Sequence, residues 1–455
     1  MFDKKTYRYF YWLITGFVGK HIKLIFLSFI LTIVCIIGLI SLTPYFETLF
    51  TSKQEIIGEA GTYDFNTLPD EIKTKVSNGL VYVNGKGEII PTLATRWEIF
   101  DQGKGYRFFL KDNLVWDDGK KFTAHDLHYQ FKDVLVKVVN DKTIEFYLKK
   151  PLQIFPTYLR TPVLRYPLIG IAGLYRLDHF KVQFGIVREL TLSPNKEELS
   201  SLKYRFYDNE TLLLNAYKKG EITSFVTTKK NIADQFADWK NTKVDKSVDY
   251  SRLLTLFFNF ENPIFKDKEV RQAIAESFDP AKITDQGEIA NGPIPPVSWA
   301  YSQTLKPLTY DVDSAEKIVK KNVPATEEAK LELATYYDYL DPTDSIVVDG
   351  LNKIGFNPDV TLIASDRPSK FDLLLAFWKV PEDPDQYYFW HQTQTQGGNI
   401  GGYKNIRVDK LLEDGRATLS TKERQVIYDD FQKVMLDDPP AVFLYYPYIY
   451  TISRK

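Results

Sequence analysis

The sequence predicts an α/β protein of at least two lobes that follows an N-terminal transmembrane helix. An uncharged apolar run occupies residues 24–42. Between residues 80 and 185, short apolar segments with period-two alternation lie between turn residues, a pattern typical of β-strands. From about residue 205, strand patterns alternate with helical patterns. A chain of 455 residues also exceeds the size of one typical core, so we expect two or more lobes.

Residues 24–42 are long enough to cross a membrane as one helix. At about 1.5 Å per residue they cover roughly the ~30 Å hydrocarbon core of a bilayer. Lysine and arginine outnumber acidic residues before the run, so the positive-inside rule places residues 1–23 in the cytoplasm. We therefore expect residues 43–60 to be a linker, and the main domain to be extracytoplasmic and held at the cell membrane by a single span.

Two other interpretations of the apolar run stay open. A cleaved signal peptide would end in a small-x-small site, but the run is followed by Thr43-Pro44-Tyr45-Phe46. A lipoprotein would carry its cysteine after a short apolar run, but Cys35, the one cysteine of the chain, lies inside the run. We favour an uncleaved anchor. With a single cysteine, neither an internal disulfide nor a cysteine-based metal site can form.

The composition is that of a globular protein and gives no sign of nucleic-acid binding. Apolar residues make up 44% of the chain and charged residues 26%, which are ordinary values. The net charge is −1, so no overall positive field points to nucleic acid. Aromatic residues reach 15%. They fit either an aromatic-rich core or an aromatic-lined cleft for an extended solute.

The β-rich part begins with a predicted strand over residues 79–83, which runs into the turn Asn84-Gly85-Lys86-Gly87. Two further strands are predicted over residues 106–110 and 142–148 because their apolar residues alternate. Between them, residues 114–131 (LVWDDGKKFTAHDLHYQF) read as a strand end, a tight turn and a capped helix. The apolar face of that predicted helix consists of Leu127, Phe131, Val134 and Leu135.

In the later part of the chain, helices and strands alternate. We expect helices over residues 212–219, ended by Gly220, 269–278, ended by Asp279-Pro280, and 345–354, ended by Gly355. Strands are expected over residues 222–226, 253–260, 360–363 and 441–446. A capping box of Ser420 and Glu423 precedes a last helix, whose predicted apolar face is Val426, Ile427, Phe431, Val434 and Met435.

Five blocks of the sequence resemble the oligopeptide/nickel-type (family 5) extracellular solute-binding proteins of ABC transporters, here in a membrane-anchored form. They occur in the order of the family and cover nearly the whole chain after residue 60. The blocks are PTLATRW (91–97), residues 114–131, residues 254–279 with NPIFKDKEVRQAI, GPIPPVSWAY (292–301) with 310–321, and DPDQYYFWHQ (383–392) with 401–412 and 439–447.

The resemblance implies a two-lobed, periplasmic-binding-protein-like fold of type II, with the three subdomains of the oligopeptide-binding type. It implies that lobe I with a β-rich subdomain covers residues 61–258 and that lobe II covers 259–430. The chain would then return to lobe I over residues 431–455. Because the apolar strand over 441–446 cannot stand alone, it must add to an existing sheet. Such lobes close around a ligand by a hinge motion.

The resemblance also places a ligand site after the apolar strand that ends at Trp378. In peptide-binding relatives, an aspartate three residues after this tryptophan holds the ligand's α-amino group, but this chain has Pro381 there. Glu382 could replace that carboxylate. Asp383 more closely matches a structural Asp-Pro turn, in which the carboxylate accepts local backbone bonds. A preference for peptides is therefore in doubt.

Other candidate ligand-binding residues lie in a glycine-rich loop and at strand ends. Residues 392–403 (QTQTQGGNIGGY) combine amide side chains with glycines that allow close approach to a ligand. The alternative is a polar loop that binds no ligand. Tyr63 and Asp64 match the first strand end that faces the family's cleft. The full set of candidates is Tyr63, Asp64, Trp299, Trp378, Glu382, Asp383, Trp390, Gln394, Gln396, Asn399 and Tyr403, and each tryptophan could instead be core.

No motif for an enzyme or a cofactor occurs, so we expect no catalytic residue, cofactor or metal. His125 and His128 are three apart on the predicted helix, but no third ligand is nearby in the sequence. Asp383 and Asp385 resemble a glycosidase pair, yet carboxylates two apart in a loop are common.

We therefore expect an extracytoplasmic solute-binding component of an ABC importer. It would act as a monomer that captures a peptide-like or other extended solute between closing lobes and delivers it to permease subunits. The alternative is a surface receptor or chaperone-like module on the same fold without a transport role. An enzyme, such as a glycoside hydrolase, is a third possibility.

Overall fold

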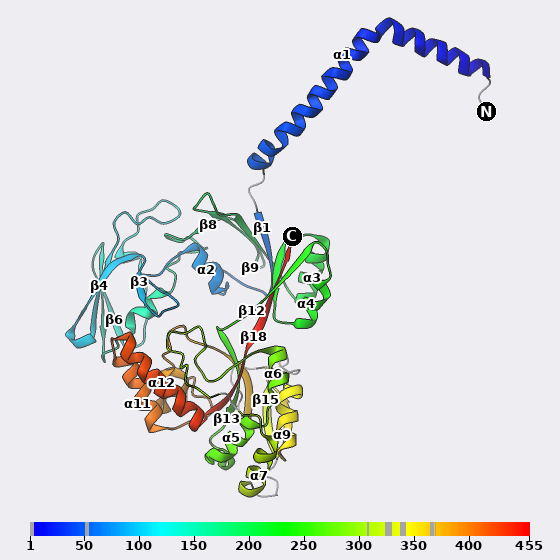
Figure 1. Cartoon of the computed structure of the whole chain (residues 1–455). Helices are drawn as coiled ribbons and strands as arrows, with labels where there is room; N and C mark the ends of the chain where they lie inside the picture. The colour runs from blue at the N-terminus through cyan, green and yellow to red at the C-terminus, as the bar shows by residue number, and fades with distance from the viewer. Residues whose placement is uncertain are drawn as a thin grey trace.

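The final strand joins the two halves of one twelve-stranded sheet (Figure 1). The structure, a computed structural model, describes residues 4–50, 54–306, 309–323, 330–336, 343–364, 368 and 370–455. The first half of β18 (Ala441–Arg454) pairs with β13 (Arg252–Phe258) and β14 (Gly287–Ile289), and its second half with β11 (Ser224–Thr227) and β12 (Thr242–Val248). The prediction that the last strand adds to an existing sheet is confirmed, and the strand extends well beyond residue 446.

We call the half of the sheet that contains β11 and β12 lobe I. It continues through β1 (Gln54–Ala60), β10 (Ser201–Tyr207), β9 (Ile186–Pro194) and β8 (Tyr175–Gln183). Residues 54–60 thus form a central strand instead of the expected linker, because they pair in parallel with β10 along their whole length. Helices α3 (Glu210–Lys219) and α4 (Lys230–Ala237) cover one face and bury Leu213, Tyr217 and Phe236 there.

A β-rich subdomain, which we count as part of lobe I, packs beside the lobe I half of the sheet, as the alternation in the sequence predicts. It consists of a hairpin, β2 (Val81–Val83) with β3 (Ile89–Pro91), and a four-stranded sheet. The sheet holds β4 (Ala94–Phe100), β5 (Gly105–Leu110), β6 (Val134–Asn140) and β7 (Thr143–Leu148). Its core is strongly aromatic and includes Tyr106, Phe108, Trp116 and Phe146. Part of the high aromatic content therefore serves this core.

The predicted helix over residues 124–135 is wrong, although its cap is present. The Thr123 amide donates to the Asp126 carboxylate at 2.8 Å and the Asp126 amide donates to the Thr123 carbonyl at 3.0 Å. Helix η2 (Ala124–Asp126) nevertheless makes a single 3-10 turn. Strand β6 begins at Val134 because a run of β-branched valines favours the extended conformation and pairs with β7.

Lobe II is a sheet with helices on both faces. Its strands are β13, β14, β17 (Leu373–Lys379), β15 (Lys330–Thr335) and β16 (Asn357–Leu362). In β13, Leu254 and Leu256 pack on one side with α5 (Lys268–Glu276), α7 (Val312–Asn322) and α9 (Asp349–Lys353). Leu253 and Phe257 pack on the other side with α11 (Ile406–Ala417) and α12 (Thr421–Asp437). Burial on both faces explains why this strand reads as a continuous apolar run.

Helix α12 begins at the predicted cap, since the Glu423 amide donates to the Ser420 hydroxyl. Its buried face includes Tyr428, Phe431, Val434 and Met435. Val426, which the sequence placed on that face, is 66% exposed, because the helix turns Arg424 and Tyr428 inward instead. The remaining short helices are α2 (Asp70–Val76), η3 (Phe155–Arg160), η4 (Pro263–Lys266), α6 (Pro280–Gln286), η7 (Thr343–Val348), α10 (Tyr387–Trp390) and η8 (Gln392–Gln394).

The N-terminal helix α1 (Lys4–Phe50) stands away from both lobes in Figure 1. Its segments Tyr7–Leu24 and Phe26–Ile33 meet at 57° and have, taken together, the length and composition of a membrane span. Within the described residues, no single helix meets that condition. One straight span over residues 24–42 is therefore not confirmed. The side chains of Cys35 and of residues 37–42 lie outside the described residues.

Helix α3 ends as predicted at Gly220, and this position gives a test of the fold. Gly220 has φ of 82°, which L side chains rarely adopt. We expect Gly220→Ala to lower the free energy of unfolding by about 1–2 kcal/mol, since an added Cβ would meet no atom closer than 3.7 Å and the cost is conformational. Urea denaturation measures it.

Gly85→Ala is the matched control for this substitution. Its Cβ would meet nothing within 4 Å and its φ lies outside the left-handed range, so we expect a change below about 0.5 kcal/mol. Equal effects of the two substitutions would contradict the assignment of Gly220 as a left-handed helix end.

Candidate functional site

The carboxyl ends of strands from the two lobes point toward each other. Strand β1 is parallel to β11, and both run opposite to β18, so β1 ends at Ala60 on the side of lobe II. Strand β17 runs in the same direction as β18, because β13 is antiparallel to both, so it ends at Lys379 on the side of lobe I. Residues 61–70 and 379–387 therefore face one another. We call the surface between them the interlobe face.

Charged side chains bridge the interlobe face. The Lys379 ammonium lies 3.2 Å from the Asp70 carboxylate at the start of α2. Arg160, at the end of η3, forms an ion pair with Glu382. The members of both pairs are exposed, with side-chain exposed fractions from 37% for Arg160 to 77% for Lys379. Such pairs are weak individually, so they can exchange partners with a solute.

A tyrosine links η3 to lobe II beside these pairs. The Tyr158 hydroxyl donates to the Asp385 carboxylate at 3.3 Å and lies 3.4 Å from the Arg416 guanidinium. Burial, followed by the negative charge of Asp385, raises the pKa of Tyr158 to about 12. Arg416 in turn holds Asp385 through a hydrogen bond from its Nε at 2.9 Å. The hydroxyl therefore stays protonated and acts here as a donor.

Asp383 lies next to this surface but its carboxylate is committed to the fold. The Arg424 guanidinium donates to both of its oxygens at 2.6 and 3.0 Å, and the Asp385 amide donates to it at 3.0 Å. The side chains of Asp383 and Arg424 are about nine-tenths buried. Burial opposes the charge of Arg424, yet the bonds and charge of Asp383 prevail and raise its pKa. The predicted structural Asp-Pro turn is confirmed.

The three candidate tryptophans have different surroundings. Trp378 is buried and its indole donates to Thr255 at 3.1 Å, and Trp390 is buried and donates to Gln386 at 2.8 Å. Trp299 is half-buried and packs against lobe I at Gly87, where a Cβ would come within 1.9 Å of its indole nitrogen. That nitrogen is buried without a hydrogen-bond partner among the described residues. Of the three, Trp299 reaches across between the lobes.

At the strand end of lobe I, Tyr63 and Asp64 are held by local contacts. The Tyr63 hydroxyl donates to Glu59 at 3.3 Å, and its ring packs on Phe206. The exposed Asp64 carboxylate accepts bonds from the Thr67 amide and hydroxyl and from the Asn66 amide. These bonds, those of Thr67 first, lower its pKa. Both residues follow the end of β1, which lies on the side of lobe II.

The glycine-rich loop over residues 392–403 lies at the other end of lobe II. Asn399 bonds to the His391 and Tyr403 carbonyls and accepts from the Tyr403 amide. The buried Tyr403 hydroxyl donates to Asp438. Gln396 and Asn399 line a cavity of about 720 Å³, whereas Gln394 is half-buried and donates to the Thr393 hydroxyl.

This cavity is separated from the interlobe face by the length of a strand. It adjoins Asn259 and Phe371, next to the paired ends Phe258 and Leu373, whereas Arg252 pairs with Lys379 at the interlobe end. Six residue steps along the strand amount to about 20 Å. The sequence-predicted candidates therefore form two groups, one at the interlobe face and one at the far end of lobe II.

Sequence reasoning missed several residues of the interlobe face. They are Asp70, Tyr158, Arg160, Lys379 and Arg416. No local motif marks them, because their contacts across the face join residues more than two hundred positions apart in the chain. Lys379 is an exception, because it directly follows the predicted strand end at Trp378. That position alone could have marked it as a candidate binding residue.

His125 and His128, in the segment over residues 114–131, are not aligned on one helix face. The helix that would have aligned them is absent, and the His128 ring instead contacts the Asp126 carbonyl at 2.9 Å. His125 lies 3.8 Å from Asp141. Within the described part of the chain, no group of three or more His, Cys, Asp or Glu side chains could hold a metal.

Comparison with known proteins gives one family and a consistent set of relatives. Residues 88–399 match the bacterial extracellular solute-binding proteins, family 5. The chain is 27% identical to the oligopeptide-binding protein AppA of Bacillus subtilis, over 86% of this chain and 85% of that protein. It is 23% identical to the probable deoxycholate-binding periplasmic protein YgiS of Escherichia coli, over 83% of each.

A solved structure shows the same fold. NikZ from Campylobacter jejuni, in complex with Ni(L-His), superposes with a TM-score of 0.71 at 23% identity, covering 89% of this chain and 95% of that chain. The two-lobed α/β architecture of periplasmic binding proteins is therefore confirmed.

The buried Asp383–Arg424 pair and the exposed Glu382 give a matched pair of substitutions. We expect Asp383→Ala to lower the free energy of unfolding by about 3–5 kcal/mol, because it leaves a buried guanidinium without its partner. For Glu382→Ala we expect a change of about 1 kcal/mol or less. Urea denaturation followed by tryptophan fluorescence compares them, and a small effect of Asp383→Ala would contradict its structural role.

Proposed function

Because this chain belongs to family 5 of the bacterial extracellular solute-binding proteins, we propose that it captures an extended solute between its lobes and delivers it to an ABC permease. The observation that carries the proposal is the pair of opposed strand ends at the interlobe face, bridged by Lys379 with Asp70 and Arg160 with Glu382. A solute held there would contact both lobes and favour their closed arrangement. No covalent chemistry is needed, so we propose binding alone.

The connections between the lobes support a hinge. The chain passes from β12 to β13 through residues 249–251, and β18 passes between the lobes near Pro447, where its partner changes from β14 to β12. Few residues therefore need to change conformation for one lobe to rotate against the other. We therefore propose that the lobes divide at residues 249–251 and near Pro447, in place of the boundaries 61–258, 259–430 and 431–455 expected from the sequence. Strand β1 then belongs to lobe I, and β13 and the first half of β18 belong to lobe II.

We propose a peptide-like or other extended solute, bound by a monomer, with Glu382 as the acceptor for a ligand ammonium. Glu382 is exposed at the interlobe face and its present partner, Arg160, lies on the other lobe. The names of the relatives show that cargo varies, since AppA is an oligopeptide-binding protein and YgiS a probable deoxycholate-binding one. Tyr63, Asp64 and Trp299 are the other predicted contacts that lie on this side of the molecule.

A ligand panel tests the proposed function. We expect at least one member of a panel of peptides, oligosaccharides and metal chelates to raise the melting temperature of the full chain in detergent, because a ligand that binds the folded state alone stabilises it. For a ligand with a free amino group, Glu382→Gln should weaken binding about tenfold or more. Isothermal titration measures the affinity.

The control for this substitution is Glu197→Gln, at an exposed position of lobe I near the end of β9, which should leave the affinity unchanged. No response to any class of ligand would contradict the solute-binding proposal. Binding that is insensitive to Glu382→Gln would contradict only the role of Glu382.

We also propose that α1 anchors the protein in the cell membrane as a single span, with the lobes extracytoplasmic. The bent pair Tyr7–Leu24 and Phe26–Ile33 has the length and composition of a span when its two segments are taken together. Basic residues outnumber acidic residues before the uncharged run over residues 24–42, which places the N-terminal end of the helix in the cytoplasm. We expect the full chain to stay in the membrane fraction after carbonate extraction. Phe29→Lys should reduce this retention, since a lysine in the span costs about 2.5–3.5 kcal/mol, whereas Phe29→Leu should not.

N-terminal sequencing of the membrane-bound protein completes this test. An intact N-terminus is expected. A mature start near residue 45 would show cleavage and contradict the anchor.

A further inference from the structure

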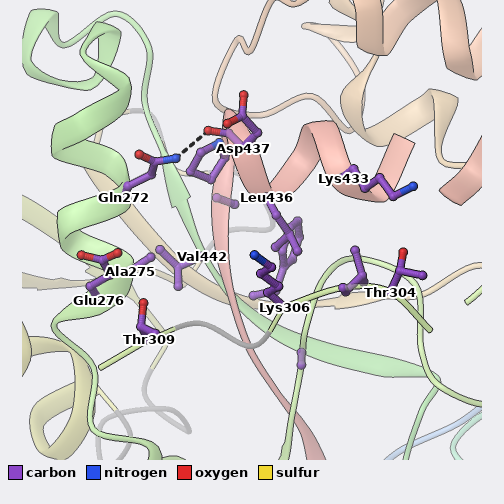
Figure 2. A pocket seen from close by; sticks show the side chains of 15 residues that line it. Gln272, Ala275, Glu276, Thr304, Lys306, Thr309, Lys433, Leu436, Asp437 and Val442 are labelled. Atoms are coloured by element: carbon purple, nitrogen blue, oxygen red, sulfur yellow. Dashed lines mark hydrogen bonds between the residues drawn. The ribbon is translucent and has the colours of Figure 1, made fainter. Parts of the chain in front are cut away.

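Lobe II contains a second cavity, on the side of the sheet away from the interlobe face. It has a volume of about 580 Å³ and lies between α5, the end of α12 and the first residues of β18 (Figure 2). Its apolar wall includes Ala290, Leu436 and Val442. The cavity adjoins Ala441 to Phe443, whereas β18 passes into lobe I near Pro447, so about 15–20 Å of strand separates them.

Two of the charged side chains at this cavity are already neutralised. Lys433 forms ion pairs with Asp429 and Asp430 on its own helix. Asp437 forms an ion pair with Lys268 at 2.9 Å. Its carbonyl also accepts a hydrogen bond from Gln272 at 2.7 Å, which joins α5 to α12 across one side of the cavity (Figure 2). These groups therefore build the wall, and Lys433 and Asp437 each already have a partner of opposite charge.

The other two charged groups, Glu276 and Lys306, have no ion pair with any residue that the structure describes. Glu276, on the last turn of α5, is half-buried, and among the described residues no side chain bonds to its carboxylate. Burial, and then the nearby charge of Asp311, raise its pKa. Lys306 also lines the cavity, and the described part of the chain offers its ammonium no ion pair. Figure 2 shows Glu276 on the α5 side, with Lys306 across the cavity from it.

We propose that this cavity binds a small zwitterion with an apolar body, whose ammonium pairs with Glu276 and whose carboxylate pairs with Lys306. The site is separate from the interlobe face and goes beyond the proposed capture of an extended solute there. A partly buried carboxylate loses hydration that only a hydrogen-bonded or charged partner restores, and a cation supplies it. The apolar wall would accept the body of the ligand, and the volume lies in the range of small-molecule sites.

A zwitterion fits better than a ligand of a single charge. A simple cation would pair with Glu276 but would be repelled by Lys306. A simple anion would pair with Lys306 but would be repelled by Glu276. Because the two groups are of opposite sign and neither forms an ion pair within the described part of the chain, a ligand that carries both charges gains an interaction at each end. The same reasoning predicts that removing either charge on the ligand weakens binding.

Three related probes test this site by isothermal titration on the full chain in detergent. We expect L-phenylalanine to bind about tenfold or more tightly than L-phenylalaninamide, which lacks the carboxylate, and 3-phenylpropanoate, which lacks the ammonium. Glu276→Gln should weaken the binding of L-phenylalanine and L-phenylalaninamide about tenfold and leave the affinity for 3-phenylpropanoate unchanged. Lys306→Gln should weaken the binding of L-phenylalanine and 3-phenylpropanoate and leave the affinity for L-phenylalaninamide unchanged.

Matched controls separate this site from the interlobe face. Glu269→Gln lies on the same helix outside the cavity and should change none of the affinities. Glu382→Gln should also leave these affinities unchanged, whereas it should weaken the binding of the solute captured at the interlobe face. The proposal would be overturned if L-phenylalanine did not bind at millimolar concentration. It would also be overturned if neither cavity substitution changed the affinity for L-phenylalanine, or if Glu382→Gln abolished its binding.

Discussion

Strand β18 hydrogen-bonds to both lobes, and this shared pairing determines where the candidate site lies. Its partners β13 and β11 fix the directions of β17 and β1. Because the backbone groups of a central strand must be paired, these directions are fixed by the pairing with β18. The carboxyl ends of β1 and β17 therefore face each other between the lobes. Residues from distant parts of the chain thereby face each other, among them Asp70 and Lys379. The geometry of the site is thus a consequence of strand direction.

Two kinds of ion pair with different strengths lie within a few residues of each other. Asp383 and Arg424 are buried and bidentate, so separating them would leave a charge without solvent. Glu382 and Arg160 are exposed on opposite lobes, where water and salt compete with the pair. The first pair holds the loop that carries Glu382, and the second can open without harm to the fold. The buried pair keeps the loop in place while the exposed pair can separate, which suits a surface between lobes that must open and close.

Local patterns predicted much of the fold and little of the pairing between segments. The cap at Ser420, the helix end at Gly220 and the buried run of β13 follow from neighbouring residues. The motif at residue 123 shows the limit, because its cap forms while the valines that follow belong to β6. There the gain from pairing with β7 outweighs a helical pattern of apolar residues. The partners of Lys379 and Glu382 had no local signal at all.

The same distinction explains why the glycine-rich loop is a weaker candidate for specificity than its composition suggests. Its amide Asn399 is buried and spends its donor and acceptor on the loop's own backbone, so little remains for a ligand. Composition gives the number of donors and acceptors, but only the structure shows which are already used. At the interlobe face the opposite holds, since the polar groups of Glu382 and Lys379 are exposed and bound to partners on the other lobe. A solute that enters between the lobes can replace those partners one for one, and in the proposed function that exchange, more than the loop, selects the cargo.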